Sequence, residues 1–124
     1  MEEVWDYKTT KKDFEFFKDE TLKWLRTYGL NDWLIEITHE APDIEGSRAT
    51  TAGTLAHKYI SIKFNPKWDI MPCKIKLKEA AFHEATEVLL IRFAILADCR
   101  FATERELTEA RHSIIQTLYN IMVK

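Results

Sequence analysis

The feature that most constrains the fold is an apolar stretch running from Lys78 to Leu96. Its apolar residues leave no broad polar face, which predicts one long helix buried on nearly every side. The middle of the stretch nevertheless carries His83, Glu84 and Glu87. Ionisable side chains in a buried helix need a partner, a metal or a water-filled cleft, because burying an unpaired charge costs on the order of several kcal/mol. This conflict between burial and charge is the main indication of function.

The length and composition are those of one compact domain over residues 1–124. Hydrophobic residues make up 46% of the chain, with only three Gly and three Pro, which favours a packed core over disorder. The formal net charge of −2 argues against nucleic-acid binding, which would need a basic surface. Cys73 and Cys99 are too few and too far apart for a disulfide scaffold or a paired-cysteine zinc site. We therefore expect reduced thiols in a cytoplasmic protein.

No membrane association is expected from the sequence. The acidic start of the chain lacks the basic region and apolar core of a signal peptide. The apolar stretch is long enough to raise the question of a membrane span, but His83, glutamates and Arg92 interrupt it. A membrane span tolerates such residues poorly, so we expect a soluble protein.

Residue periodicity predicts one helix and three strands before the apolar stretch. Apolar residues at helical spacing predict a helix over residues 10–28, with Gly29 placed to end it. Alternation of apolar and polar residues predicts strands over residues 33–39 and 59–64, and a weaker strand over residues 48–56. The short link between the last two strands predicts a hairpin.

The rest of the chain completes an α+β pattern. Two prolines make residues 65–72 irregular. The run Thr103-Glu-Arg-Glu106 is a capping box that opens the last helix. That helix is expected to pack through Leu107, Ala110, Ile114, Leu118 and Ile121. The order helix, three strands, helix, helix predicts helices packed on a small antiparallel three-stranded sheet, with a long buried central helix.

The ionisable residues of the central helix have the spacing of a metal site. His83 and Glu87 are four residues apart and project from the same side of a helix, with Glu84 about 100° round from His83. This is the arrangement of H-E-x-x-H, in which two histidines bind zinc and the glutamate activates the zinc-bound water. Glu87 stands where that motif has its second histidine, and a carboxylate oxygen is also a zinc ligand.

Three parts of the chain, taken together, resemble a known protein family. They are the helix written A-F-H-E-A-T-E-V-L-L, the short sheet with Trp33 and the Asn65–Trp68 loop before it, and the run Glu109-Ala-Arg-His112 after it. Together they resemble the small zincin-like metallopeptidases of phages and prophages. The resemblance covers about residues 14–121 and departs from the family's motif at Glu87. It implies a zincin-like fold, a zinc cofactor and peptidase activity.

A catalytic zinc site needs a third protein ligand. If the last two helices form an antiparallel hairpin that turns near Arg100, residue 87 lies level with about residue 114. His112 is close to that level and is the preferred third ligand, and Glu109, about one turn nearer the loop, is the second choice. Both lie away from the apolar stripe centred on Ile114.

The first functional hypothesis is a zinc-dependent hydrolase acting on peptide bonds. His83, Glu87 and His112 would hold the zinc, and Glu84 would take a proton from the bound water as it attacks the carbonyl. The edge of the sheet beside the helix would bind an extended peptide or protein substrate by strand addition.

Other interpretations stay open. The chain could be a catalytically inactive, phage-encoded protein that keeps the fold and modulates a protein partner. Its tryptophans could lie at that interface or equally in the core: Trp5, Trp33 and Trp68. Arg92 could instead neutralise a buried glutamate and make the cluster structural. The E-x-x-H run of Glu109 and His112 also matches di-iron helical bundles, which need more helices than the strands leave. His39 and His57, at strand ends, are expected to be exposed.

Overall fold

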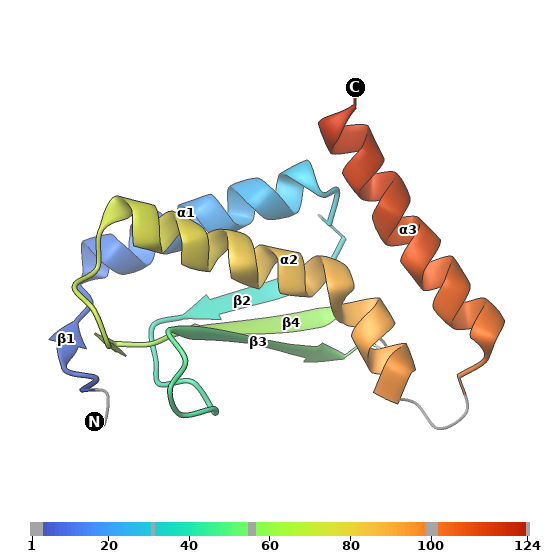
Figure 1. Cartoon of the computed structure of the whole chain (residues 1–124). Helices are drawn as coiled ribbons and strands as arrows, with labels where there is room; N and C mark the ends of the chain where they lie inside the picture. The colour runs from blue at the N-terminus through green and yellow to red at the C-terminus, as the bar shows by residue number, and fades with distance from the viewer. Residues whose placement is uncertain (1–3, 31, 55–56, 99–101, 124) are drawn as a thin grey trace.

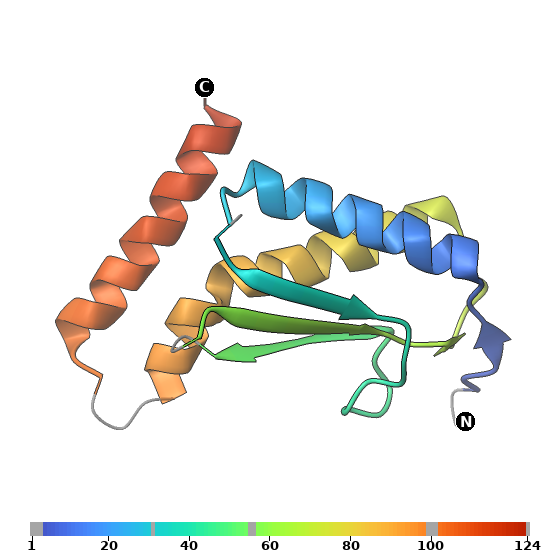
Figure 2. The same ribbon diagram turned by 180° about the vertical axis from the view of Figure 1, so that it is seen from behind.

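The computed structural model describes residues 4–30, 32–54, 57–98 and 102–123, and of Arg92 only the backbone. The elements follow in the order β1 (Tyr7–Lys8), α1 (Lys11–Thr27), β2 (Leu34–Thr38), β3 (Ala49–Thr54), β4 (Tyr59–Phe64), β5 (Lys67–Trp68), α2 (Lys74–Asp98) and α3 (Glu104–Met122). Helices α1 and α2 cover one face of a three-stranded sheet, and α3 stands at one end of the domain (Figures 1 and 2). No helix within the described ranges is long and apolar enough to cross a membrane.

Helix α1 confirms the first predicted helix and has clear signals at both ends. The Thr10 hydroxyl accepts the Asp13 amide at 3.1 Å, and the Asp13 carboxylate accepts the Thr10 amide at 2.9 Å, which forms a capping box. The helix ends at Tyr28, and Gly29 follows with a φ of +74°, a conformation that favours glycine. The helix buries Phe17, Thr21 and Leu25.

The three predicted strands are present, but the sheet is mixed and not antiparallel. Its strand order is β2-β4-β3, with β3 antiparallel and β2 parallel to β4. The alternation of each strand fixes which face it buries but not which neighbour it takes. The most apolar strand takes the centre: Ile60, Ile62 and Phe64 of β4 are all fully buried. The chain after β2 therefore returns through residues 39–48 to form the far strand, β3, before β4 fills the position between them.

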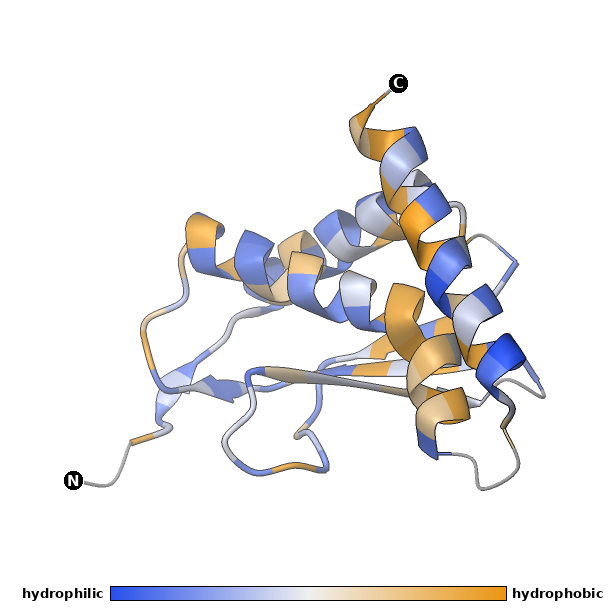
Figure 3. Cartoon of the chain, turned by 45° about the vertical axis from the view of Figure 1, so that its right-hand side comes forward, coloured by the Kyte–Doolittle hydropathy of each residue, from blue (hydrophilic) through white to orange (hydrophobic). Residues whose placement is uncertain are grey.

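Helix α2 is longer than predicted, and the expectation that it is buried on nearly every side is wrong. Only one side is buried, through Leu77, Ala81, Glu84, Ala85, Val88 and Leu89. Leu90 is 37% exposed on the other side, and Phe82, whose ring meets Trp24 of α1 at the margin of the buried side, is 46% exposed. The α1 helix and the sheet cover a single side of α2, so some of its apolar residues stay in contact with solvent. Figure 3 shows that hydrophobic residues predominate in the second half of α2.

Helix α3 begins where its capping box predicts and packs less closely than expected. The Thr103 hydroxyl accepts the Glu106 amide at 3.1 Å. Ala110 is buried, and Ile114 and Ile121 are half-buried against the core, but Leu118 is 37% exposed and not part of the core. The helix crosses α2 obliquely instead of lying antiparallel beside it (Figures 1 and 3).

A second small sheet, not predicted from the sequence, anchors the N-terminal segment. Tyr7 pairs with Trp68 and Lys8 with Lys67, antiparallel. The Thr9 hydroxyl donates to the Asn65 carbonyl at 3.1 Å. Two-residue strands carry too little alternation to be recognised in a sequence. The pairing fixes the N-terminal segment beside the end of β4.

The same segment explains why His39 is half-buried and not exposed as predicted. The single hydroxyl hydrogen of Thr9 goes to Asn65, so the hydroxyl accepts from His39 Nε2, which is 2.7 Å away. The imidazole stacks on the Phe14 ring with centroids 5.1 Å apart. His57, in the turn before β4, is exposed as expected.

The close approach of β3 and β4 at Gly53 gives a test of the sheet. A Cβ atom at Gly53 would lie 2.5 Å from the Tyr59 carbonyl oxygen and from Ile60 Cδ1. We expect Gly53→Ala to lower the free energy of unfolding by about 1–3 kcal/mol, because a backbone atom must move. Denaturant unfolding measures this, with Ala52→Val as the control because Ala52 is exposed on the same strand. Equal unfolding free energies for the two variants would contradict the strand pairing.

Candidate active site

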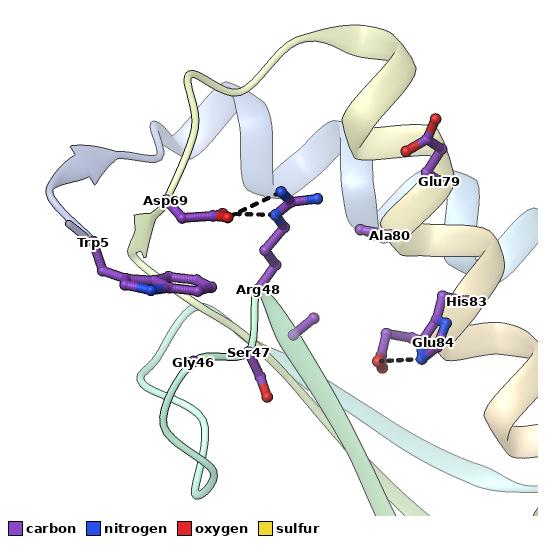
Figure 4. A pocket seen from close by; sticks show the side chains of 10 residues that line it. Trp5, Gly46, Ser47, Arg48, Asp69, Glu79, Ala80, His83 and Glu84 are labelled. Carbon is purple, nitrogen blue, oxygen red and sulfur yellow. Dashed lines mark hydrogen bonds and ion pairs between the residues drawn. The ribbon is translucent and has the colours of Figure 1, made fainter. Parts of the chain in front are cut away.

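The candidate site is a pocket of about 510 Å³ between the first half of α2 and the start of β3. Ala80, His83 and Glu84 line it from the helix, and Arg48 and Ala49 line it at the start of the strand. Trp5 and Asp69 stand on the opposite side, beside Arg48 (Figure 4). The pocket therefore joins the ionisable residues of the central helix to one edge of the sheet.

Glu84 is the buried ionisable group of this pocket. The residue is 3% exposed, and its Oε2 accepts the Thr51 hydroxyl of β3 at 3.1 Å. Burial raises the pKa of the Glu84 carboxyl above its ordinary value, and the Thr51 hydrogen bond and nearby His83 oppose this only in part. The Glu87 charge raises the pKa further. A carboxyl group with a raised pKa in a pocket has the properties of a general acid or base.

His83 and Glu87 lie on the same side of the helix, as their spacing predicts, and their side chains meet at its surface. His83 Nε2 lies 3.5 Å from a Glu87 carboxylate oxygen and 4.0 Å from Glu84 Oε1. The His83 side chain is 69% exposed and the Glu87 side chain 50%. The His83 imidazole and the Glu87 carboxylate are therefore accessible to a metal ion from solvent, whereas the Glu84 carboxyl is buried next to them.

Helix α3 carries the two predicted third ligands. His112 is exposed, and the half-exposed Glu109 carboxylate accepts Arg105 Nε at 3.1 Å on its own helix. Across the described ranges, no three or more His, Cys, Asp or Glu side chains form a group that could hold a metal ion. The structure brings together His83, Glu84 and Glu87, and it does not bring His112 or Glu109 into a metal-binding group with them. Their roles as metal ligands stay a prediction.

These residues fit a zinc site in chemistry but not in number. An imidazole nitrogen and a carboxylate oxygen are both zinc ligands, and His83 and Glu87 present them on the same side of one helix turn. A catalytic site uses three protein ligands. The described residues supply two of them. The side chain of Arg92 lies outside the described part of the chain, so the suggestion that it neutralises a buried glutamate also stays a prediction.

Sequence reasoning missed the other side of the pocket. Arg48 Nε and Nη2 donate to the two carboxylate oxygens of Asp69 at 2.8 and 3.1 Å, which lowers the pKa of the Asp69 carboxyl. The guanidinium lies 5.5 Å from the centre of the buried Trp68 ring. No local pattern marks two residues that meet across an irregular loop. The contact of Thr51 with Glu84 was missed for the same reason, because Thr51 lies in a weakly predicted strand far from Glu84 in the sequence.

Comparison with known proteins gives no relative for this chain. No protein-family model matches it. No curated protein and no solved structure matches it either. The resemblance to the small zincin-like metallopeptidases therefore rests on the residues alone and stays a prediction.

The buried carboxyl of Glu84 predicts a pH-dependent stability difference. A carboxyl whose pKa is raised by folding stabilises the protein fully below its unfolded pKa, and that contribution is lost as the pH rises through the folded value. Glu84→Gln avoids the loss because the amide does not ionise. We expect its unfolding free energy, relative to wild type, to increase as the pH rises from about 4 to 7.

Urea unfolding at several pH values, in the presence of a chelator, measures this difference. Glu79→Gln is the matched control, because Glu79 is exposed on the same helix and its replacement also removes one carboxylate. A Glu84→Gln difference that does not vary with pH, or that varies as the control does, would show that Glu84 is not buried as described.

Proposed function

We propose that the protein is a zinc-dependent hydrolase of the zincin type that cleaves peptide bonds. The observation that carries the proposal is the buried Glu84 carboxyl, which faces a pocket with His83 and Glu87 beside it and an open strand edge in front of it. Peptide hydrolysis needs a base for water and a place to hold an extended chain. A buried carboxyl in a pocket and the outer strand β3 occur together in this fold, which supports the proposal.

Glu84 serves as the base through one of its two oxygens. Oε2 already accepts a hydrogen bond from the Thr51 hydroxyl. Oε1, on the side of His83, is the oxygen that takes a proton from water attacking the carbonyl of the substrate. Burial raises the pKa of the Glu84 carboxyl toward neutral pH, and a general base works best when its pKa is near the operating pH.

His83 and Glu87 are the residues that would hold the metal, with His112 as the predicted third ligand and Glu109 as the second choice. Bound zinc supplies a water of lowered pKa and polarises the substrate carbonyl. Glu87 contributes a negative charge where the family motif has a neutral imidazole, so the site is more anionic than that of H-E-x-x-H.

Strand β3 is the element that would hold the substrate. It is the outer strand of the sheet, and the Arg48 carbonyl, one residue before it, accepts the Asn65 amide next to β4. Because hydrogen-bonding direction alternates along an antiparallel strand, the backbone groups of Ala49, Thr51 and Gly53 point to the open edge. A peptide added there passes the Glu84 carboxyl at Thr51.

A second candidate is a non-catalytic peptide-binding protein that keeps the pocket and the strand edge. It is favoured by the count of metal donors, because the described residues contribute only two, His83 and Glu87, to a possible zinc site. Metal binding separates the two candidates without requiring a substrate.

Metal content is the first test of the hydrolase. Protein dialysed against zinc and then buffer should retain about one equivalent by elemental analysis. His83→Ala should reduce this to background with an unchanged circular-dichroism spectrum, whereas His57→Ala, at an exposed turn, should retain the metal. Wild-type protein that stays metal-free in excess zinc would favour the peptide-binding candidate.

The role of Glu84 is tested by separating metal binding from activity. Glu84→Gln should keep its zinc and lose peptidase activity on a casein-derived peptide mixture by a factor of about 100 or more, because the amide cannot accept the proton from water. Mass spectrometry of the peptides measures the cleavage. Loss of zinc together with activity would instead make Glu84 a ligand.

A further inference from the structure

A groove lies at the opposite edge of the sheet, along β2. Two adjoining hollows of about 450 and 330 Å³ run between α1 and β2, and they share Leu22 and Ile35. The strand has no neighbour on its outer side within the described chain (Figure 2). This groove is separate from the pocket at Glu84.

The outer edge of β2 offers free backbone hydrogen-bonding positions. The Leu34 amide donates to the Lys58 carbonyl at 2.8 Å, beside β4, so Leu34 and alternate residues after it face β4. The backbone groups of Ile35 and Ile37 therefore point outward. Natural edge strands are usually protected by proline, lysine or a bulge. The sequence Leu-Ile-Glu-Ile-Thr of β2 has no proline or lysine, and its pairing with β4 runs without a break.

The groove beside this edge is apolar in the middle and has a basic residue at each end. Glu36 also lines the hollow at the Lys18 end, where its carboxylate accepts the Tyr59 hydroxyl at 2.8 Å. Its floor and walls consist mainly of Leu22, Leu25, Leu30, Trp33, Ile35 and Ile37. Lys18 lines the hollow at one end and Arg26 the hollow at the other, on the same stripe of α1 as Leu22. No ion pair within the described part of the chain involves Lys18 or Arg26.

The spacing of these charges matches the repeat of an extended chain. Arg26 lies eight residues after Lys18 in α1, a rise of about 12 Å. In a strand, side chains on one face recur every second residue, so residues four apart are about 13 Å apart. An added strand with an acidic residue, an apolar residue and an acidic residue at alternate positions would place its charges next to Lys18 and Arg26 and its apolar side chain next to Leu22.

We propose that the β2 edge binds an extended segment of a partner protein with the pattern acidic-x-apolar-x-acidic. The backbone pairs with Ile35 and Ile37, the apolar side chain enters the groove under α1, and the two acidic side chains meet Lys18 and Arg26. The main-chain bonds provide affinity, and the alternating side chains provide specificity. A symmetric pairing with β2 of a second copy, centred on Glu36, is disfavoured because it would place two Glu36 carboxylates opposite each other.

A capped synthetic peptide, Thr-Glu-Thr-Val-Thr-Glu-Thr, tests the proposal on the full chain. In a titration followed by amide NMR, we expect the signals of Ile35 and Ile37 to shift and their hydrogen exchange to slow. The same peptide with both glutamates replaced by lysine should bind about tenfold more weakly, since two surface ion pairs are lost and like charges meet. The Glu84→Gln protein serves as the host, so that the result does not depend on hydrolysis.

Reversing the charges of the protein tests whether the charge pattern of the groove determines the peptide preference. The double variant Lys18→Glu/Arg26→Glu should prefer the lysine peptide, which requires a folded groove and excludes simple loss of structure. Lys12→Glu/Lys23→Glu, with the same change of charge at exposed positions of α1 outside the groove, should keep the wild-type preference. Equal affinity for the two peptides, shifts only at the β3 edge, or self-association of the protein through Ile35 and Ile37 would each overturn the proposal.

Discussion

The burial of one side of α2 against α1 and the sheet is the constraint on which the rest of the structure depends. Leu77, Ala81, Ala85 and Val88 define that buried side, and Glu84 lies at its margin. The helical repeat then leaves His83 and Glu87 in solvent, next to the Glu84 carboxyl. The packing of α2 thus buries the Glu84 carboxyl and leaves the side chains of His83 and Glu87 accessible.

The Thr51 hydroxyl connects this helix to the sheet and gives the buried carboxyl its only tight partner described in the structure. Glu84 is therefore held from the strand that is also the outer edge of the sheet. The sheet has two such edges, and they differ in character. The β3 edge lies beside an acidic helix turn, whereas the β2 edge lies beside a groove with Lys18 and Arg26 at its ends.

Local signals in the sequence predicted the elements well. The capping box at Thr103, the glycine after α1 and the alternation of β4 each act over a few residues, so they can be recognised without the fold. The spacing of His83 and Glu87 also predicted correctly that they lie on the same side of the helix, because this follows from the helix alone.

Features that depend on distant contacts could not be predicted in this way. The parallel pairing of β2 with β4 depends on which strand takes the centre, and the half-exposed state of α2 depends on what packs against it. The bidentate pair of Arg48 and Asp69 forms across a loop, and the N-terminal segment reaches the pocket only because β1 pairs with β5. Whether His112 or Glu109 approaches His83 belongs to the same class, since it depends on how α3 lies against α2.

The central claim is that His83 and Glu87 hold a metal ion in front of Glu84. X-ray diffraction from zinc-soaked crystals, recorded on both sides of the zinc absorption edge, tests it most directly. The account predicts an anomalous peak within about 2.0–2.2 Å of His83 Nε2 and a Glu87 carboxylate oxygen. Crystals that contain zinc elsewhere but show no peak between these two side chains would contradict it.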